Sequence, residues 1–574
     1  MGLTGSLYTS LSGLNTNSEG ISVTGNNIAN VNTTSFKASR ANFETQISQT
    51  FRLPSAPSAE LGGTNALQVG LGVRLGSISR NFNDGTIQPT GVNTDLAIEG
   101  DGFFVLNFNG SQRYTRAGTF GLDRDFNLVN PGGGIVQGFN VDDDFNVVEG
   151  VTGNVRIPLG SLTIAEATQN VRFSGNLNAD GDAATVGSLI TSAPIYSDAL
   201  ATTPAAAADN LVDLFDAGGT SLFSIGDVIS VDGAQKGGAT LPGKTFEVTD
   251  PLTPNTTTTS PDGFGATLSD FLAFLEDMLG IDTSVGGGVS VDGLGQVTVE
   301  GNTGEANDLV LDNANIVVNK TTNPTLPFDL SKQREADGES VRTTFVMFDS
   351  LGSELVVDLS IVLEDKSNTG TSWRFYANSD NDSDLDRVLG SGTLEFDVNG
   401  QLATVSDNNI TIDRAGTGAA TPQQVTLNFS DPDNGVSALS DTTSQMAAIS
   451  QDGSPIGTLE DFSVSQDGTI VGVFSNSLLR DLGRVVLANF VNPEGLIDMG
   501  SNLFNVSVAS GNAVVTTPGL AGTGNVVGGA LELSNVDLSQ EFINLITYST
   551  GFTASSRALT TSDRMIQELL ATIR

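Results

Sequence analysis

The most regular set of potentially reactive side chains in this chain is a run of alternate aspartates: Asp380, Asp382, Asp384 and Asp386. Carboxylates at this spacing open the calcium-binding loop, which also needs a glycine at its sixth position and a glutamate at its twelfth. Counted from the first aspartate, those positions hold Leu385 and Ser391. The run therefore favours a solvated loop over a calcium site.

Other kinds of catalytic or ligand-binding chemistry find little support. The chain has no histidine and no cysteine, which excludes Ser-His-Asp and Cys-His nucleophiles and zinc–thiolate sites. It has 66 acidic residues, so chance carboxylate pairs are common, and no spacing marks one pair for acid–base catalysis. The glycine-rich stretch 70–76 departs from the phosphate-binding pattern. We therefore predict no enzymatic activity, no metal and no cofactor.

The formal net charge of −41 argues against nucleic-acid binding, which needs basic surface, and against anionic membranes. Residues 1–36 contain a single charged side chain, Glu19, and residues 538–574 carry equal numbers of acids and bases. Neutral ends can pack against copies of themselves at little Coulomb cost, while an acidic exterior keeps an assembly in solution. No run approaches 18 apolar residues and the N-terminus lacks a Sec signal pattern. We expect neither membrane insertion nor Sec export.

Both ends of the chain carry apolar residues at alternating steps of three and four, which is the repeat of a coiled-coil seam. We predict terminal helices at 1–36 and 537–574 that form an inner polymerisation domain. The apolar seam residues, which we expect to mediate self-assembly, are Leu7, Leu11, Leu14, Ile21, Ile28, Leu538, Phe542, Leu545, Phe552, Leu559, Ile566 and Leu570. A helix hairpin that packs only on its own subunit is the alternative. The polar residues that dilute both seams favour contacts between subunits.

The two terminal helices differ in intrinsic stability. Asp537 is placed to cap the C-terminal helix. The N-terminal segment contains Gly5, Gly13, Gly20 and Gly25, each of which lowers helix propensity. Alone in water that segment should fray, so we expect packing during assembly to order it.

Between the ends, short apolar stretches separated by Gly, Asn and Asp turns predict strands. The predicted fold class is mainly β, with terminal α-helical coiled-coil segments and nested, discontinuous β domains on a helical, hairpin-like stem. Its expected parts are a linker or extended segment at 37–90, a discontinuous β domain from 91–165 and 450–536, a second β domain from 166–183 and 331–449, and an inserted outer α+β domain at 184–330.

Two local patterns in the middle of the chain are specific enough to place elements. A hairpin is expected to turn at Asp349–Gly352, with a further strand from Trp373. In the insertion, a helix is expected to end at Gly280. Its apolar face consists of Leu268, Phe271, Leu272, Leu275 and Leu279.

Several blocks of the chain resemble the bacterial flagellar axial proteins, the family of rod, hook and hook-associated proteins. In order, they are NNIANVNTTSFK (Asn26–Lys37), TDLAIEGDGFFVL (Thr94–Leu106), YTRAGTFGLD (Tyr114–Asp123) and GALELSNVDLSQEF (Gly529–Phe542). The family usually has Gly and Tyr where this chain has Ser35 and Phe36, and Gly where it has Ser477. The positions of the terminal signature are Asn26, Asn27, Ala29, Asn30, Asn32, Thr33, Phe36, Lys37, Ser534, Asn535 and Asp537.

The central part is similar to the hook members of that family. The similar blocks are VRFSGNLNADGD (Val171–Asp182), FVMFDSLGSELVVDLSIVL (Phe345–Leu363) and GSPIGTLEDFSVSQDGTIVGVFSN (Gly453–Asn476). The resemblance implies a structural subunit that assembles head-to-tail into the tubular, curved hook, a universal joint that transmits motor torque to the filament. It also implies an extracellular location reached through the flagellar type III export apparatus, and contacts with the distal rod, the hook cap and hook-associated junction proteins.

Three other functions stay open on sequence alone. A hook-associated junction protein would share the terminal helices. An acidic, β-rich adhesin or calcium-dependent surface binder would share the composition. An exported polysaccharide-degrading enzyme would need a catalytic carboxylate pair, which no spacing in this chain singles out.

Overall fold

The computed structural model describes residues 2–252, 262–319, 325–430, 435–440 and 442–572. The chain folds as two compact units: unit 1 is Met1–Leu162 with Thr458–Arg574, and unit 2 is Thr163–Gly457. Unit 1 is therefore built from both ends of the chain, and unit 2 from its middle. The fold is mainly β with a packed pair of terminal helices, which confirms the predicted fold class. The finer division into five parts stays a prediction.

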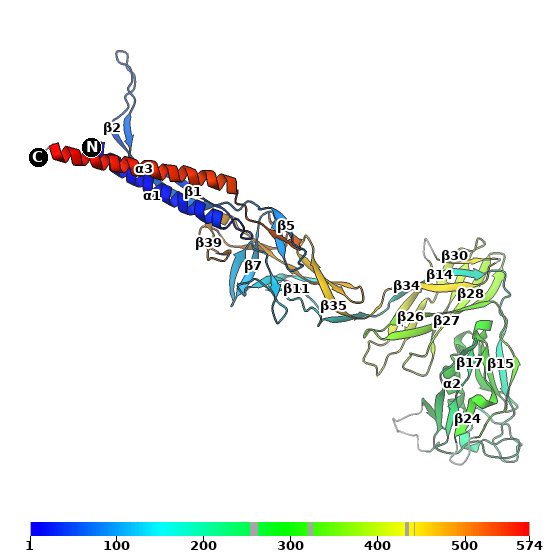
Figure 1. The fold of residues 1–574 in the computed structure, drawn as a ribbon. Coiled ribbons are helices and arrows are strands. Elements are labelled where there is room, and N and C mark those ends of the chain that lie inside the picture. Colours follow the sequence, from blue (N-terminus) through cyan, green and yellow to red (C-terminus); the bar gives the residue numbers. More distant parts are fainter. Residues whose placement is uncertain (1, 253–261, 320–324, 431–434, 441, 573–574) are drawn as a thin grey trace. The chain divides into compact units, whose positions relative to one another are not determined.

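Two long helices dominate one end of unit 1. Helix α1 spans Gly2–Ala29 and helix α3 spans Leu538–Thr572. They run side by side in opposite directions, with both chain ends at the same end of the pair (Figure 1). The predicted cap at Asp537 is present, because its carboxylate accepts hydrogen bonds from the backbone N–H of Ser539 at 2.9 Å and of Gln540 at 3.2 Å.

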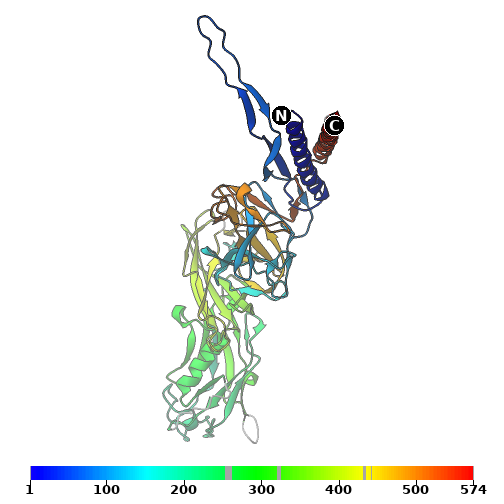
Figure 2. The same ribbon diagram turned by 90° about the vertical axis from the view of Figure 1, so that its left-hand side faces the viewer.

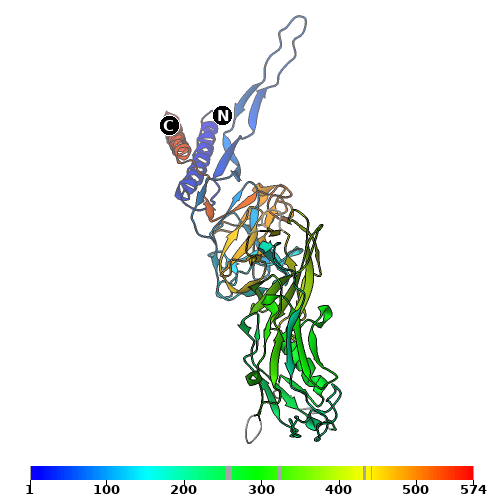
Figure 3. The ribbon, with the colours of Figure 1, turned by 90° about the vertical axis from the view of Figure 1, so that its right-hand side faces the viewer.

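The segment after α1 forms two short antiparallel ladders. Strand β1 (Ser39–Thr45) pairs with β4 (Val73–Arg80) beside α1. Strand β2 (Ser48–Arg52) pairs with β3 (Leu67–Gly70) in a hairpin arm that projects away from the helices (Figures 2 and 3). The arm is exposed along its length.

The rest of unit 1 is an antiparallel β body whose core contains Phe103, Tyr114, Phe490 and Phe504. Two small ladders return the chain from this body to α3: β43 (Ala530–Glu532) pairs with β5 (Ile87–Pro89), and β42 (Asn525–Gly528) with β6 (Leu96–Glu99). The other strands of the body are β7 (Phe103–Phe108), β8 (Ser111–Thr115), β9 (Gly121–Leu122), β10 (Leu128–Val129), β11 (Ile135–Val141), β12 (Val147–Asn154), β36 (Thr469–Phe474), β37 (Leu479–Val485), β38 (Leu487–Asn489), β39 (Ile497–Asp498), β40 (Leu503–Asn505) and β41 (Val514–Thr516). Strand β35 (Ser454–Val464) pairs with β36 from Leu459 onward.

Unit 2 contains a five-stranded antiparallel sheet in sequence order. Its strands are β26 (Ser340–Phe348), β27 (Glu354–Ser367), β28 (Gly370–Ser379), β29 (Val388–Phe396) and β30 (Leu402–Ser406). The predicted hairpin turn is confirmed, since the backbone N–H of Gly352 donates to the carbonyl of Asp349 at 2.9 Å. Trp373 lies on β28, also as predicted, with none of its surface exposed.

A second sheet packs on the first around a shared core that includes Phe173, Phe345, Trp373 and Phe429. The strands of this second sheet are β14 (Asn170–Asn178), β31 (Asn409–Ile412), β32 (Gln423–Asn428), β33 (Val436–Leu439) and β34 (Gln445–Gln451).

The remainder of unit 2 has a core of its own, centred on helix α2 (Leu268–Leu279). The helix begins with a capping box at Thr267 and ends at Gly280, whose φ of 60° suits glycine. Both its apolar face and its end are as predicted. The strands around it are β15 (Gly187–Ser192), β16 (Val228–Val231), β17 (Gln235–Lys236), β18 (Ala239–Thr240), β19 (Lys244–Val248), β20 (Gly263–Gly265), β21 (Gly288–Val291), β22 (Val297–Thr303), β23 (Leu309–Val310), β24 (Ile316–Asn319) and β25 (Leu330–Arg334).

Candidate functional site: the terminal helix pair and its buried anchor

Small residues form the contact between α1 and α3. The hydroxyls of Ser6 and Ser562 lie 2.9 Å apart. A Cβ added to Gly13 would lie 2.8 Å from the Ser555 hydroxyl, and one added to Gly20 would lie 3.0 Å from the Tyr548 ring. The helices therefore approach closely because glycine and serine leave room for them.

None of the predicted seam residues is fully buried in the single subunit. Those that are half-buried are Leu7, Leu14, Ile21, Ile28, Leu545, Leu559 and Ile566. Those that are exposed are Leu11, Leu538, Phe542, Phe552 and Leu570. A single subunit thus covers the predicted apolar seam only in part and leaves five of its residues exposed. The role of these twelve residues in self-assembly stays a prediction.

The N-terminal half of α3 carries an apolar face that points away from α1. This apolar face consists of Leu538, Phe542, Ile543 and Ile546, and Ile546 is the most exposed of them at 66%. Ile543 and Ile546 are absent from the predicted seam because that seam follows a 3.5-residue repeat. The exposed row follows i, i+4 spacing on a straight helix, and a search at that spacing could have found it.

The outward face changes character along α3. In the C-terminal half, helical spacing continues this side with Arg557, Thr561, Arg564 and Glu568, which are exposed. The exposed apolar residues Met565, Leu569 and Leu570 lie off this row. One helix therefore presents an apolar patch followed by a polar one.

The signature at the end of α1 and just after it folds into a tight polar turn. The Asn27 side chain, 1% exposed, forms two hydrogen bonds with Ser39: its Nδ2 donates to the carbonyl at 2.7 Å, and its Oδ1 accepts from the backbone N–H at 2.9 Å. Asn30 donates to the carbonyl of Asn26 at 2.9 Å, and the hydroxyl of Thr33 donates to Oδ1 of Asn30 at 3.1 Å. These bonds fix the direction in which the chain leaves the helix.

Asn535 ties the two signature blocks together. Its Oδ1 accepts from the backbone N–H of Ala38 at 2.8 Å, and its Nδ2 donates to the carbonyls of Asn81 at 2.9 Å and Asn83 at 2.8 Å. Nearby, the hydroxyl of Ser534 accepts a bond from Val536 at 3.3 Å. The remaining signature residues are Phe36, which is half-buried, and Ala29 and Asn32, which are exposed.

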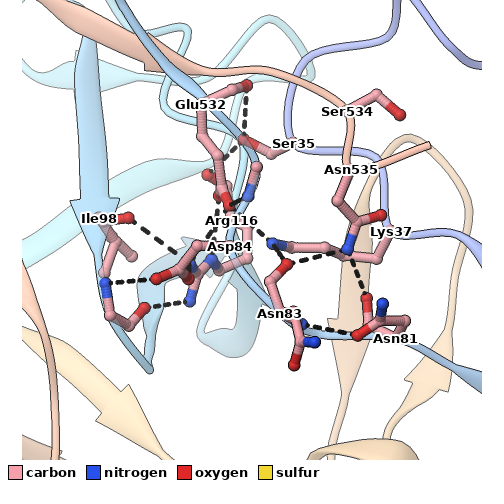
Figure 4. A network of polar contacts seen from close by, with 12 residues as sticks. Ser35, Lys37, Asn81, Asn83, Asp84, Ile98, Arg116, Glu532, Ser534 and Asn535 are labelled. Carbon is pink, nitrogen blue, oxygen red and sulfur yellow. Dashed lines mark hydrogen bonds and ion pairs between the residues drawn. The ribbon is translucent and has the colours of Figure 1, made fainter. Parts of the chain in front are cut away.

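Four charged side chains form a cluster at the base of the helix pair, here called the buried anchor: Lys37, Asp84, Arg116 and Glu532 (Figure 4). Glu532 accepts from Lys37 Nζ at 2.6 Å and from Arg116 Nε at 3.1 Å. Arg116 also donates to Asp84 at 2.6 Å. The side chains of Lys37, Arg116 and Glu532 are at most 2% exposed, and that of Asp84 is 42% exposed.

Backbone groups satisfy further donors and acceptors of the anchor. Lys37 donates to the carbonyl of Asn83 at 2.7 Å, and Arg116 donates to the carbonyls of Gly100 and Gly102 at 2.8 Å and 3.0 Å. The second lone pair of Glu532 Oε1 accepts from the backbone N–H of Gly85 at 2.8 Å. Two positive and two negative charges cancel, which is the condition under which buried charges are tolerated.

The electrostatics of the anchor follow from burial and pairing. Burial alone would raise the pKa of Glu532, but Arg116 and Lys37 outweigh it and hold that pKa below its ordinary value. Burial lowers the pKa of Lys37, and the nearby Arg116 lowers it further. The anchor has no catalytic geometry; it fixes the chain at the point where both helices leave the β body.

The two serines that stand where the family usually has glycine both have left-handed backbone. Ser35 has a φ of 53° and Ser477 a φ of 66°, a region that favours glycine. The hydroxyl of Ser35 donates to the carbonyl of Arg116 at 2.9 Å, so at that position the side chain gains a buried hydrogen bond that glycine lacks.

The four alternate aspartates, Asp380, Asp382, Asp384 and Asp386, lie in the loop between β28 and β29. Asp380 pairs with Arg387. Within the described ranges, no group of three or more acidic side chains is placed to hold a metal ion.

Four protein-family models match this chain in separate segments. They are "Flagella basal body rod protein" at residues 7–37, "Flagellar hook protein FlgE/F/G D1 domain" at 97–181, "Flagellar basal body protein FlaE D2 domain" at 312–454 and "Flagellar basal body rod FlgEFG protein C-terminal" at 527–572. All four describe proteins of the flagellar rod and hook. Lys37, Arg116 and Glu532 each lie in a different matched segment, so the buried anchor joins three of them.

Relatives that match over nearly their whole length identify which of the rod and hook proteins this chain is similar to. The flagellar hook protein FlgE of Treponema pallidum is 30% identical over 579 residues, covering 99% of each chain. The FlgE proteins of Borreliella burgdorferi and Salmonella typhimurium are 28% and 26% identical, each covering 98% of both chains. Among solved structures, flagellar hook protein FlgE2 of Helicobacter pylori matches with a TM-score of 0.38 and 18% identity, covering 78% of this chain and 100% of that one. This chain belongs to the flagellar hook protein family.

Family membership decides two of the sequence predictions. The resemblance to flagellar axial proteins is confirmed. The family consists of structural proteins, which also confirms that the chain is not an enzyme. No helix in the described part of the chain is both long enough and apolar enough to cross a membrane.

Proposed function

We propose that this chain is the structural subunit of the flagellar hook, which assembles head-to-tail into a curved tube and acts as a universal joint between motor and filament. The observation that carries the proposal is the apolar face of α3. Leu538, Phe542 and Ile546 are 39%, 48% and 66% exposed in a subunit whose terminal helices are already paired. Exposed apolar faces of this kind mark interaction sites.

The distribution of charge supports a second copy of the chain as the occupant of that face. The whole chain carries −41, whereas the terminal segments are close to neutral. Two copies therefore repel least where their terminal helices meet. A contact in which this face meets a different surface of the next copy does not close on itself, and repeated contacts of that type build a helical tube.

In this arrangement the twelve seam residues and the apolar face form the inner wall of the tube. The buried anchor then gives the hook a rigid joint for torque. Lys37 follows α1, Glu532 precedes α3, and the Glu532 carboxylate accepts hydrogen bonds from Lys37 and from Arg116, which belongs to the β body. A force applied to the helices reaches the body through these bonds.

The proposal includes a location and partners. The subunit leaves the cell through the flagellar type III export apparatus and becomes part of an extracellular structure. The tube grows on the distal rod beneath a hook cap, and hook-associated junction proteins follow it. The helix α1, with its glycines and polar residues, becomes stable by packing during this assembly.

The alternatives are less well supported. A junction protein would share the terminal helices, but the relatives that match over nearly the whole chain carry the name of hook protein. An acidic adhesin would give no reason for neutral terminal segments that expose apolar residues on α3.

The test is electron microscopy of the purified full-length protein under salting-out conditions, next to a chain that lacks residues 1–36 and 537–574. The full chain is expected to form tubes and the trimmed chain to remain monomeric with its β domains folded. Tubes from the trimmed chain would contradict assembly through the terminal helices. A full chain that fails to elongate isolated hook–basal bodies would contradict the hook function itself.

A further inference from the structure

Unit 2 contains a small cavity at the boundary between its two cores. The cavity has a volume of about 20 Å³, enough for one water-sized or chloride-sized occupant. One side is formed by Lys236 of β17 and Leu279 of α2. The other is formed by Arg342 of β26, Asn378 of β28 and Arg387. In a chain with 25 basic residues against 66 acidic ones, three cations around one cavity are an unusual concentration of positive charge.

Two of the three cations at the cavity have an ion-pair partner, and the third has none. Arg342 Nη2 lies 2.9 Å from the carboxylate of Asp358, and Arg387 pairs with Asp380. Lys236 has no ion pair among those of the described residues; its Nζ donates to the carbonyl of Gly280 at 2.5 Å. Asp282 also acts on the ammonium, but it forms no ion pair with Lys236 among those of the described residues, and its carboxylate accepts hydrogen bonds from Ser284.

Two buried polar atoms at the cavity lack a partner. They are Nε of Arg387 and Oδ1 of Asn378, and their residues are 8% and 7% exposed. Asn378 Oδ1 and Lys236 Nζ both lie close to Gly280, within 2.7 Å and 3.5 Å of the position that a Cβ would take there. Buried polar atoms are nearly always satisfied in native proteins, so the cavity is built for a polar occupant.

The identity of that occupant follows from the charge. A monovalent anion would accept hydrogen bonds from Arg387 Nε and from the free N–H groups of Lys236, and it would balance the excess charge. A half-turn of the Asn378 amide would present its Nδ2–H to the anion as a further donor. We propose that this cavity binds a small monovalent inorganic anion of halide size.

The titration of Lys236 supports the same assignment. Burial, together with the neighbouring Arg387 and Arg342, lowers the pKa of Lys236 to about 7, although Asp358 and Asp282 act in the opposite direction. An anion in the cavity opposes all three effects and keeps the lysine charged. Because Lys236 belongs to the α2 part of the unit and Arg387 to the sheet part, the bound anion also ties the two cores together. This inference is independent of the proposed assembly function.

The first experiment compares thermal unfolding of the full-length protein in sodium chloride and in sodium gluconate at equal ionic strength. Trp373, the only tryptophan, reports on unit 2. The transition is expected to be roughly 2 to 4 °C higher in chloride. Lys236→Gln should abolish the difference, whereas Lys244→Gln, at a partly exposed ion pair of the same α2 part, should keep it. Equal transitions of the wild-type protein in both salts would mean that water fills the cavity, and would overturn the proposal.

A second measurement keeps the proposal testable if Lys236→Gln does not fold. Crystals of the wild-type protein grown in sodium bromide should show an anomalous peak within hydrogen-bond distance of Lys236 Nζ and Arg387 Nε. A cavity without anomalous signal, in crystals that show bromide elsewhere, would overturn the assignment.

Discussion

The terminal helix pair of unit 1 and the five-stranded sheet of unit 2 bury their side chains in opposite ways. The sheet closes its core within one chain: Leu359, Trp373 and Phe375 have no exposed surface. The helix pair joins through glycine and serine and leaves Phe542 and Ile546 about half exposed or more. The core of the sheet is complete in a single subunit, whereas the helix pair leaves an apolar surface uncovered.

The polar clusters of the two units also differ in whether the chain itself supplies every partner. In the buried anchor of unit 1, two cations face two carboxylates and every described bond runs within the subunit. In the cavity of unit 2, one cation is in excess and two buried atoms lack a partner. A balanced cluster holds a fixed joint, and an unbalanced one points to a missing ligand.

The largest expected effect on stability is that of Glu532→Gln. The substitution leaves Lys37 and Arg116 buried without their shared carboxylate, which should cost about 3–5 kcal/mol. Hydrogen exchange of strands β5, β6 and β43 should accelerate accordingly. Unit 2, followed by the fluorescence of Trp373, should unfold at an unchanged urea concentration.

The matched control for this substitution is Glu44→Gln, which breaks an exposed pair with Arg74 at 2.9 Å. It should change stability by less than about 1 kcal/mol. If the two variants lost stability equally, the anchor would not be the joint between the helices and the body.

Acidification should change the stability of the two units in opposite directions. The pKa of Glu532 is lowered in the folded protein, so the ionised carboxylate stabilises unit 1 at pH values above its ordinary pKa of 4.5. This stabilisation is lost as the pH falls below about 4.5. In unit 2, burial, together with Asp386 and Glu276, raises the pKa of Asp277 to about 6. Burial, with Asp384, likewise raises the pKa of Asp382 to about 6. A carboxyl with a raised pKa contributes stability at low pH that is lost as the pH rises through that value.

Unit 2 should therefore become more stable between about pH 6.5 and pH 5, before unit 1 begins to lose stability. Urea unfolding followed by Trp373 measures the gain, and hydrogen exchange of β6 and β43 follows unit 1. The double substitution Asp277→Asn and Asp382→Asn should remove the gain. A gain of equal size in that variant would show that other groups cause it.

The smallest predicted effect concerns the two serines with positive φ. Ser477→Gly should stabilise unit 1 by about 1 kcal/mol, because glycine adopts the left-handed backbone without a steric penalty. Ser35→Gly relieves the same penalty but loses the buried bond to the carbonyl of Arg116, which offsets the gain. Urea unfolding of both variants checks the difference. A larger gain at Ser35 than at Ser477 would contradict it.

Sequence patterns were sufficient for elements whose signal is local. The helix 268–279 combines an apolar face with a glycine stop, and the hairpin at Asp349–Gly352 combines strand alternation with a turn, so both were predictable. The heptads placed α1 and α3, but not their contact. Gly13 and Ser555 carry no hydrophobic signal, and their importance appears only when two helix backbones approach each other.

The buried anchor was predictable only in part. Lys37 and Asn535 were found through the family signature, whereas Arg116 and Glu532 were missed. These two lie 416 positions apart, and no local pattern links residues at such a separation. A usable signal was the presence of single charges within otherwise apolar blocks, in YTRAG and GALEL, since a buried charge requires a partner.

The central claim, that the apolar face of α3 is covered by another subunit, is tested most directly by Ile546→Asp. Ile546 is 66% exposed in the subunit, so the new charge should leave the monomer folded and enter a buried site only in the polymer. The critical concentration for tube formation, measured by sedimentation, should rise by roughly a hundredfold or more. Thr561→Asp, on the polar half of the same helix, should change it little. An Ile546→Asp protein that assembles at the wild-type concentration would contradict the account.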